Sequence, residues 1–77
     1  MQTDFMLDTG RLGCGDLVLS IFQQMKLLAP GQTLQVMAYD EAAEMDIPAW
    51  CRSTGHTLIH QEQTTLPKRF VIRKREQ

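Results

Sequence analysis

Cys14 is the side chain in this sequence best suited to chemistry. It stands between Gly13 and Gly15, with Arg11 before it and Asp16 after it. An apolar stretch precedes this segment and an amphipathic stretch follows it, so we expect the cysteine at the N-terminus of a helix. Unpaired main-chain N–H groups and the positive end of the helix dipole favour a thiolate there. Because the thiolate is the nucleophilic form of cysteine, the sequence predicts a reactive Cys14.

The charges near Cys14 predict only modest activation of its thiol. A helix N-terminus stabilises the thiolate by about 0.3–1 kcal/mol, which lowers the pKa by about 0.2–0.7 unit. The carboxylate of Asp16 acts in the opposite direction, and Arg11 offsets part of it. Asp8 and Asp16 are too acidic to serve as general bases at neutral pH. The competing interpretation is that Cys14 is only a small residue in a tight loop.

The other candidate ligands and nucleophiles are predicted to be structural. Cys51 and Trp50 fall on the apolar stripe of an expected helix, so we expect Cys51 in the core and Trp50 in the core or at its edge. His56 and His60 are four apart in an expected strand. They share a face there but lie too far apart for a tetrahedral metal site. We therefore expect no metal and no cofactor.

Length and composition predict one globular domain over residues 1–77. The chain is 43% hydrophobic and 22% charged, which argues against disorder. No apolar run approaches the roughly 20 residues that a membrane-spanning helix needs. The first four residues lack a basic signal-peptide region. These features predict a cytoplasmic protein that does not insert into membranes.

The first half of the chain predicts a strand, a helix and a second strand. Residues 5–7 form the first strand, and Asp16 is the expected N-cap of a helix that ends before Pro30 and Gly31. The strand at residues 33–39 alternates apolar and polar side chains. The helix stripe comprises Leu17, Val18, Ile21, Phe22, Met25 and Leu28, and the buried strand face comprises Leu34, Val36 and Ala38.

The second half predicts a helix and a hairpin. Asp46 is the expected cap of the second helix, Pro48 lies in its first turn, and Gly55 ends it. Strands at residues 56–62 and 68–74 follow, joined by the loop 63–67. The resulting order is βαβαββ. A chain of this length is long enough for one helical layer on one sheet.

The C-terminal segment 67–77 is strongly basic. It holds five Lys and Arg residues against one glutamate. Such a segment serves as a contact for an acidic protein or a phosphate backbone, or as a charged edge strand that resists aggregation, and the sequence favours the edge strand. Phe70 is the segment's one aromatic residue and the isoelectric point is near 6.0. Direct nucleic-acid binding is therefore disfavoured.

These motifs together resemble the TusA/SirA-like sulfur-carrier proteins over nearly the whole chain. The similar segments are Leu7-Asp8, Leu12-Gly13-Cys14, residues 30–34, Asp40, residues 46–51, Gly55-His56 and residues 70–74. The resemblance implies an α+β, two-layer βαβαββ sandwich like the C-terminal domain of translation initiation factor 3. Its four-stranded mixed sheet would carry both helices on one face.

The same resemblance implies a sulfurtransferase function at Cys14. The cysteine would accept sulfane sulfur as a persulfide from a cysteine desulfurase or other persulfide donor and pass it to an acceptor protein. Gly13, Gly15, Asp16 and Arg11 would form the supporting loop. The chain departs from the family's Cys-Pro-x-Pro motif, because Gly15 and Leu17 stand where the prolines belong. The alternative is therefore a non-catalytic interaction or regulatory module that keeps the fold.

Overall fold

The computed structural model describes residues 3–10, 14–62 and 67–76, with Cys14 and Gly15 described by their main chain alone. The described part has the predicted βαβαββ order. In chain order the elements are β1 (Phe5–Asp8), α1 (Cys14–Leu27), β2 (Thr33–Ala38), α2 (Ala43–Thr54), β3 (Thr57–Glu62) and β4 (Lys68–Arg73). Each predicted strand lies within one or two residues of an observed one.

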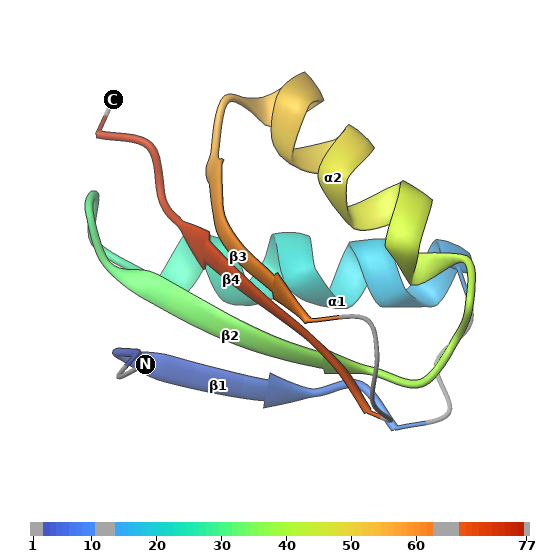
Figure 1. The fold of residues 1–77 in the computed structure, drawn as a ribbon. Coiled ribbons are helices and arrows are strands. Elements are labelled where there is room, and N and C mark those ends of the chain that lie inside the picture. The colour runs from blue at the N-terminus through green and yellow to red at the C-terminus, as the bar shows by residue number, and fades with distance from the viewer. Residues whose placement is uncertain (1–2, 11–13, 63–66, 77) are drawn as a thin grey trace.

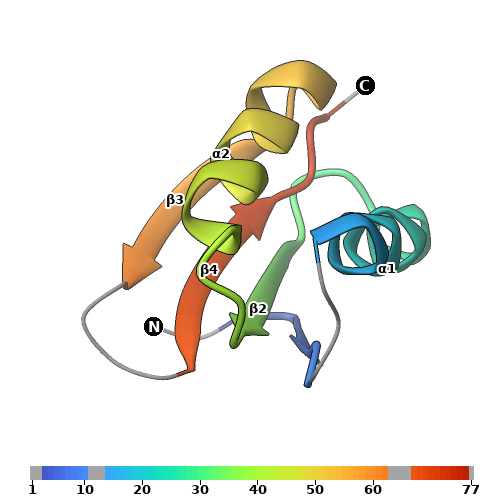
Figure 2. The same ribbon diagram turned by 90° about the vertical axis from the view of Figure 1, so that its right-hand side faces the viewer.

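The four described strands form one mixed sheet in the order β1-β2-β4-β3. β1 and β2 are parallel and are joined through α1, whereas β4 runs antiparallel to both of its neighbours. Figures 1 and 2 show α1 and α2 on the same side of this sheet. The structure thus confirms the two-layer α+β sandwich.

The core lies between the helices and one face of the sheet, as the periodicities predicted. Leu34, Val36 and Ala38 of β2 are fully buried and contact the buried stripes of both helices. The prediction is wrong for one residue of the α1 stripe, because Phe22 is 42% exposed. The ammonium of Lys26 lies 4.5 Å from the centre of the Phe22 ring. Phe22 lies at the margin of the stripe, where the helix surface turns away from the sheet.

α2 begins earlier than predicted. Its first residue is Ala43, so Asp46 lies in the first turn instead of capping it, and Pro48 lies inside the helix. Ala42 is the N-cap residue, and no side chain in the described part of the protein caps this helix end; the Asp40 carboxylate accepts the Ala42 N–H at 2.9 Å in the turn before the helix. The other end is as predicted, because Gly55 closes the helix with φ 85° and donates its N–H to the Cys51 carbonyl.

The basic C-terminal strand is not an edge strand, contrary to the prediction. β4 lies between β2 and β3 and pairs with both along its length. The sequence order hides this, because the hairpin β3–β4 inserts its second strand beside β2. Charge on β4 therefore does not protect an open edge, and its basic side chains need another explanation.

Candidate functional site

Cys14 is the first residue of α1, so the main chain places it at a helix N-terminus as predicted. The helix starts two residues before the expected cap, and Asp16 is an exposed residue of its first turn. Arg11 and Gly13 lie outside the described residues, as does the side chain of Cys14. The described part of the predicted supporting loop is therefore the main chain of Gly15 and the whole of Asp16.

Residues 8–10, which precede the cysteine loop, form hydrogen bonds with β2 and with Tyr39, the residue that follows β2. The N–H and the hydroxyl of Thr9 both donate to the Met37 carbonyl, at 3.0 and 2.9 Å. The carboxylate of Asp8 accepts the Gly10 N–H at 3.0 Å and the hydroxyl of Tyr39 at 3.3 Å. Thr9 is buried, and Gly10 has φ 56°, a conformation that favours glycine. This arrangement positions the start of the segment that leads to Cys14.

Asp8, Thr9 and Tyr39 were missed as site residues by the sequence reasoning. Asp8 appeared there as a poor general base and in the Leu7-Asp8 segment of the family resemblance, but not as a residue that positions Cys14. The detectable signal is the Asp-Thr-Gly run directly after a strand, because Asp side chains in turns commonly accept a main-chain N–H two residues on. Contact with Tyr39 depends on the parallel pairing of β1 with β2. Desolvation, and then the negative charge of Asp8 and its hydrogen bond, raise the pKa of Tyr39.

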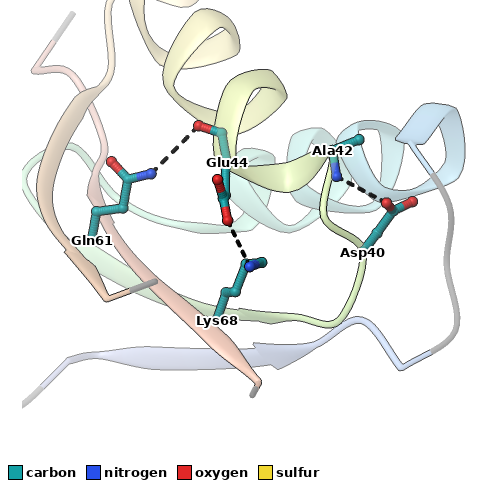
Figure 3. A network of polar contacts seen from close by, with 5 residues as sticks. All are labelled: Asp40, Ala42, Glu44, Gln61 and Lys68. Atoms are coloured by element: carbon teal, nitrogen blue, oxygen red, sulfur yellow. Dashed lines mark hydrogen bonds and ion pairs between the residues drawn. The ribbon is translucent and has the colours of Figure 1, made fainter. Parts of the chain in front are cut away.

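The N-terminus of α2 lies at the same end of the sheet and carries a polar network (Figure 3). The ammonium of Lys68 is 2.7 Å from a carboxylate oxygen of Glu44. The side-chain amide of Gln61 donates to the main-chain carbonyl of Glu44 at 3.4 Å. These contacts hold the first turn of α2 against β3 and β4.

Cys51 is a core residue, as predicted. Its side chain is 2% exposed within the core cluster, and burial raises the pKa of its thiol to about 11 although Arg52 lowers it slightly. At neutral pH it is a neutral thiol closed off from solvent. Cys51 is thus unsuited to nucleophilic chemistry.

The two histidines lie in different environments. The ring of His56 is tilted against Trp50, with centroids 5.2 Å apart, and its Nδ1 accepts the Arg75 N–H at 3.1 Å. Burial, and then the charges of Arg75 and Lys74, lower the pKa of His56. His60 is exposed on β3. Within residues 3–10, 14–62 and 67–76, no three potential metal ligands come together.

Three basic side chains of the C-terminal segment have structural partners. Lys68 pairs with Glu44, Lys74 Nζ donates to the Leu28 carbonyl at 2.6 Å, and Arg75 Nη1 donates to the Thr54 carbonyl at 2.8 Å. The last two therefore satisfy carbonyl groups at the C-terminal ends of α1 and α2, where cations are favourable. Arg69 and Arg73 are exposed.

Comparison with known protein families gives a match over most of the chain. None of the described helices has the length and apolar character required to cross a bilayer. The family model described as "Sulfurtransferase TusA" matches residues 6–74, from β1 to just past β4. The match spans both the segment that leads to Cys14 and the polar network at α2, and the chain belongs to the TusA sulfurtransferase family.

Proposed function

We propose that this protein carries sulfane sulfur as a persulfide on Cys14. The observation that carries the proposal is the start of α1 at Cys14 in a chain of the TusA family. A helix N-terminus offers unpaired main-chain N–H groups and a positive dipole end to a developing thiolate. α1 begins there even though neither proline of the family motif is present.

The transfer requires no oxidant. The Cys14 thiolate attacks the outer sulfur of a donor persulfide, a new S–S bond forms, and the donor cysteine leaves as a thiolate. The reverse arrangement unloads the carrier, when an acceptor thiolate attacks the outer sulfur and Cys14 leaves. A cysteine desulfurase or another persulfide donor loads the protein in the cytoplasm, and an acceptor protein receives the sulfur. The partner enzymes supply the remaining chemistry.

Intact-mass measurement tests the proposal directly. The protein is incubated with a cysteine desulfurase and cysteine, and we expect the mass to increase by one sulfur atom. Cys14→Ser should abolish the gain, whereas Cys51→Ser should keep it, because Cys51 is buried with a raised pKa. Adding an acceptor thiol protein should then remove the extra sulfur.

A folded protein that gains no sulfur would contradict the carrier function. That result would favour an interaction or regulatory module that keeps the fold without the prolines of the cysteine loop. Circular dichroism of the same samples shows whether each variant is folded, so a loading failure is not confused with unfolding.

A further inference from the structure

A shallow pocket of about 450 Å³ lies at the end of the sheet away from the start of α1. It is lined by Gly55, Thr57, Arg73, Arg75 and Glu76, which come from the α2–β3 junction and from the end of β4. In Figure 1 this end lies near the C-terminus, opposite the first turn of α1. Its chemistry is therefore separate from that of Cys14.

Arg73 and Thr57 are placed to act on the same ligand. They are directly paired residues of β4 and β3, and side chains of such a pair project from the same face of a sheet. Arg73 is exposed, and its guanidinium makes no hydrogen bond or ion pair with the described part of the chain. The free guanidinium of Arg73 and the hydroxyl of Thr57 together offer several hydrogen-bond donors, and neither side chain carries a negative charge.

Arg75 supplies a second, fixed cation. Its Nη1 donates to the Thr54 carbonyl at 2.8 Å, and its main-chain N–H donates to Nδ1 of His56 at 3.1 Å. These contacts satisfy a carbonyl at the negative end of the α2 dipole and leave other guanidinium N–H groups available. Burial is the largest cause of the lowered pKa of His56, and the positive charges of Arg75 and then Lys74 lower it further.

Among the described residues, Glu76 is the one acidic group that lines the pocket. Its carboxylate lies toward the β2 side, because a methyl group built on Gly31 would be 3.6 Å from Glu76 Oε1. The two arginines outnumber it, so an anion entering the pocket meets a net positive lining.

We propose that this pocket binds a tetrahedral oxyanion of the phosphate or sulfate class. Arg73 and Arg75 hold the charge, and the Thr57 hydroxyl donates a further hydrogen bond. Guanidinium groups suit such anions because their N–H donors form a planar fork that matches two oxygens. Cys14 takes no part in this binding.

Titration of the ¹⁵N-labelled protein with sodium sulfate, against sodium chloride of equal ionic strength, tests the proposal. We expect saturable shifts of the Gly55 and Thr57 amide signals with sulfate only. Arg73→Gln should weaken binding by about tenfold, as expected for loss of a charge-assisted pair. Arg69→Gln is the matched control, since Arg69 is an exposed arginine of the same strand outside the pocket, and should bind as the wild type does.

Three further measurements sharpen the test. Glu76→Gln should tighten binding, because it removes the opposing charge. Sulfate should also raise the pKa of His56, since a bound anion offsets the charges of Arg75 and Lys74 that lower it. Inorganic phosphate at a pH where it is a dianion shows which of the two anions is preferred.

Two outcomes would overturn the proposal. One is chemical shift changes that do not saturate with either anion, and the other is binding that Arg73→Gln and Arg69→Gln weaken equally. Sulfur loading at Cys14 is a separate measurement, so either proposal can fail alone.

Discussion

Gln61 of β3 donates a side-chain hydrogen bond to the main-chain carbonyl of Glu44 in α2, at 3.4 Å (Figure 3). Pro48 explains the contact. In a regular helix the N–H of residue 48 would donate to the Glu44 carbonyl, but proline has no N–H. The side chain of a neighbouring strand therefore provides the hydrogen bond that the helix itself lacks.

This explanation predicts coupling between Gln61 and Pro48. Gln61→Ala should lower the free energy of unfolding by about 0.5–1 kcal/mol, the usual net value of one such hydrogen bond. In a Pro48→Ala background the new alanine restores the helical N–H, so the same change at Gln61 should cost less. Urea denaturation of the four proteins measures both costs. An equal cost in the two backgrounds would show that the proline is irrelevant to the Gln61 contact.

Lys68 and Glu44 form an ion pair with unequal burial. The Lys68 side chain is 9% exposed and that of Glu44 is 41% exposed. Glu44→Gln leaves a buried ammonium with a neutral partner and should destabilise the protein by about 1–2 kcal/mol, below the value for a fully buried pair because water reaches this site. Lys68→Met removes the buried charge together with its desolvation penalty and should be nearly neutral.

The order of the two variants in thermal or urea unfolding is the decisive comparison. In the Lys68→Met background, Glu44→Gln should have almost no further effect, since no buried cation is left unpaired. If Lys68→Met is the more damaging change, then the lysine's hydrocarbon stem, and not its charge, accounts for the contribution of this residue.

The sequence predicts the fold here because its signals are local and agree. The alternation in β2, the stripe of α1 and the turn at Gly55 each follow from neighbouring residues, and each is confirmed except for Phe22 in the stripe. The predictions that failed depend on tertiary partners. The predicted start of α2 was too late because Asp46 and Pro48 resemble a helix start. Pro48 lies inside the helix instead, and the Glu44 carbonyl, which has no helical N–H donor, accepts a hydrogen bond from Gln61, a residue distant in sequence.

The position of β4 failed for a similar reason. A hairpin after β2 can place either of its strands beside β2, and composition does not choose between them. The choice buries Phe70 and Ile72 under the helices and gives Lys68 its partner Glu44. At the candidate site, the placement of Cys14 was predictable from the glycines and the following stripe, whereas the contact of Tyr39 with Asp8 was not.

Cys51 should make stability fall with pH in the alkaline range. Burial raises the pKa of its thiol from 9.0 to about 11. Between these values the unfolded chain loses the proton and the folded protein keeps it, so unfolding becomes more favourable as pH rises. Below about pH 9 both states are protonated and the effect vanishes. For one group the slope is at most about 1.4 kcal/mol per pH unit.

Comparison with Cys51→Ala isolates this effect. The variant has a lower absolute stability because it loses packing in the core, so the relevant quantity is the slope of the unfolding free energy against pH. Between about pH 9 and 11 that slope should be shallower in the variant. Parallel curves would mean that the thiol ionises as readily in the folded protein as in the unfolded chain.

Asp8 should affect sulfur loading through the position of the segment before Cys14. Its carboxylate accepts hydrogen bonds from the Gly10 N–H and from Tyr39. Asp8→Ala removes both and should slow persulfide formation about threefold to tenfold, because the nucleophile is then less well positioned. Tyr39→Phe removes only the second contact and should have a smaller effect. The initial rate of mass gain with a cysteine desulfurase measures both.

Asp4 supplies the matched control. Like Asp8, it accepts a main-chain hydrogen bond through its carboxylate, but it lies just before β1, at the opposite end of the strand from Asp8. Asp4 Oδ2 accepts the Thr33 N–H at 2.9 Å, at the far end of the sheet from the start of α1. Asp4→Ala should lower the melting temperature to a similar degree as Asp8→Ala and leave the loading rate unchanged. Equal loading rates for the two variants at equal stability would mean that Asp8 contributes only to folding, because a positioning role requires a loss specific to the end of β1 that leads to Cys14.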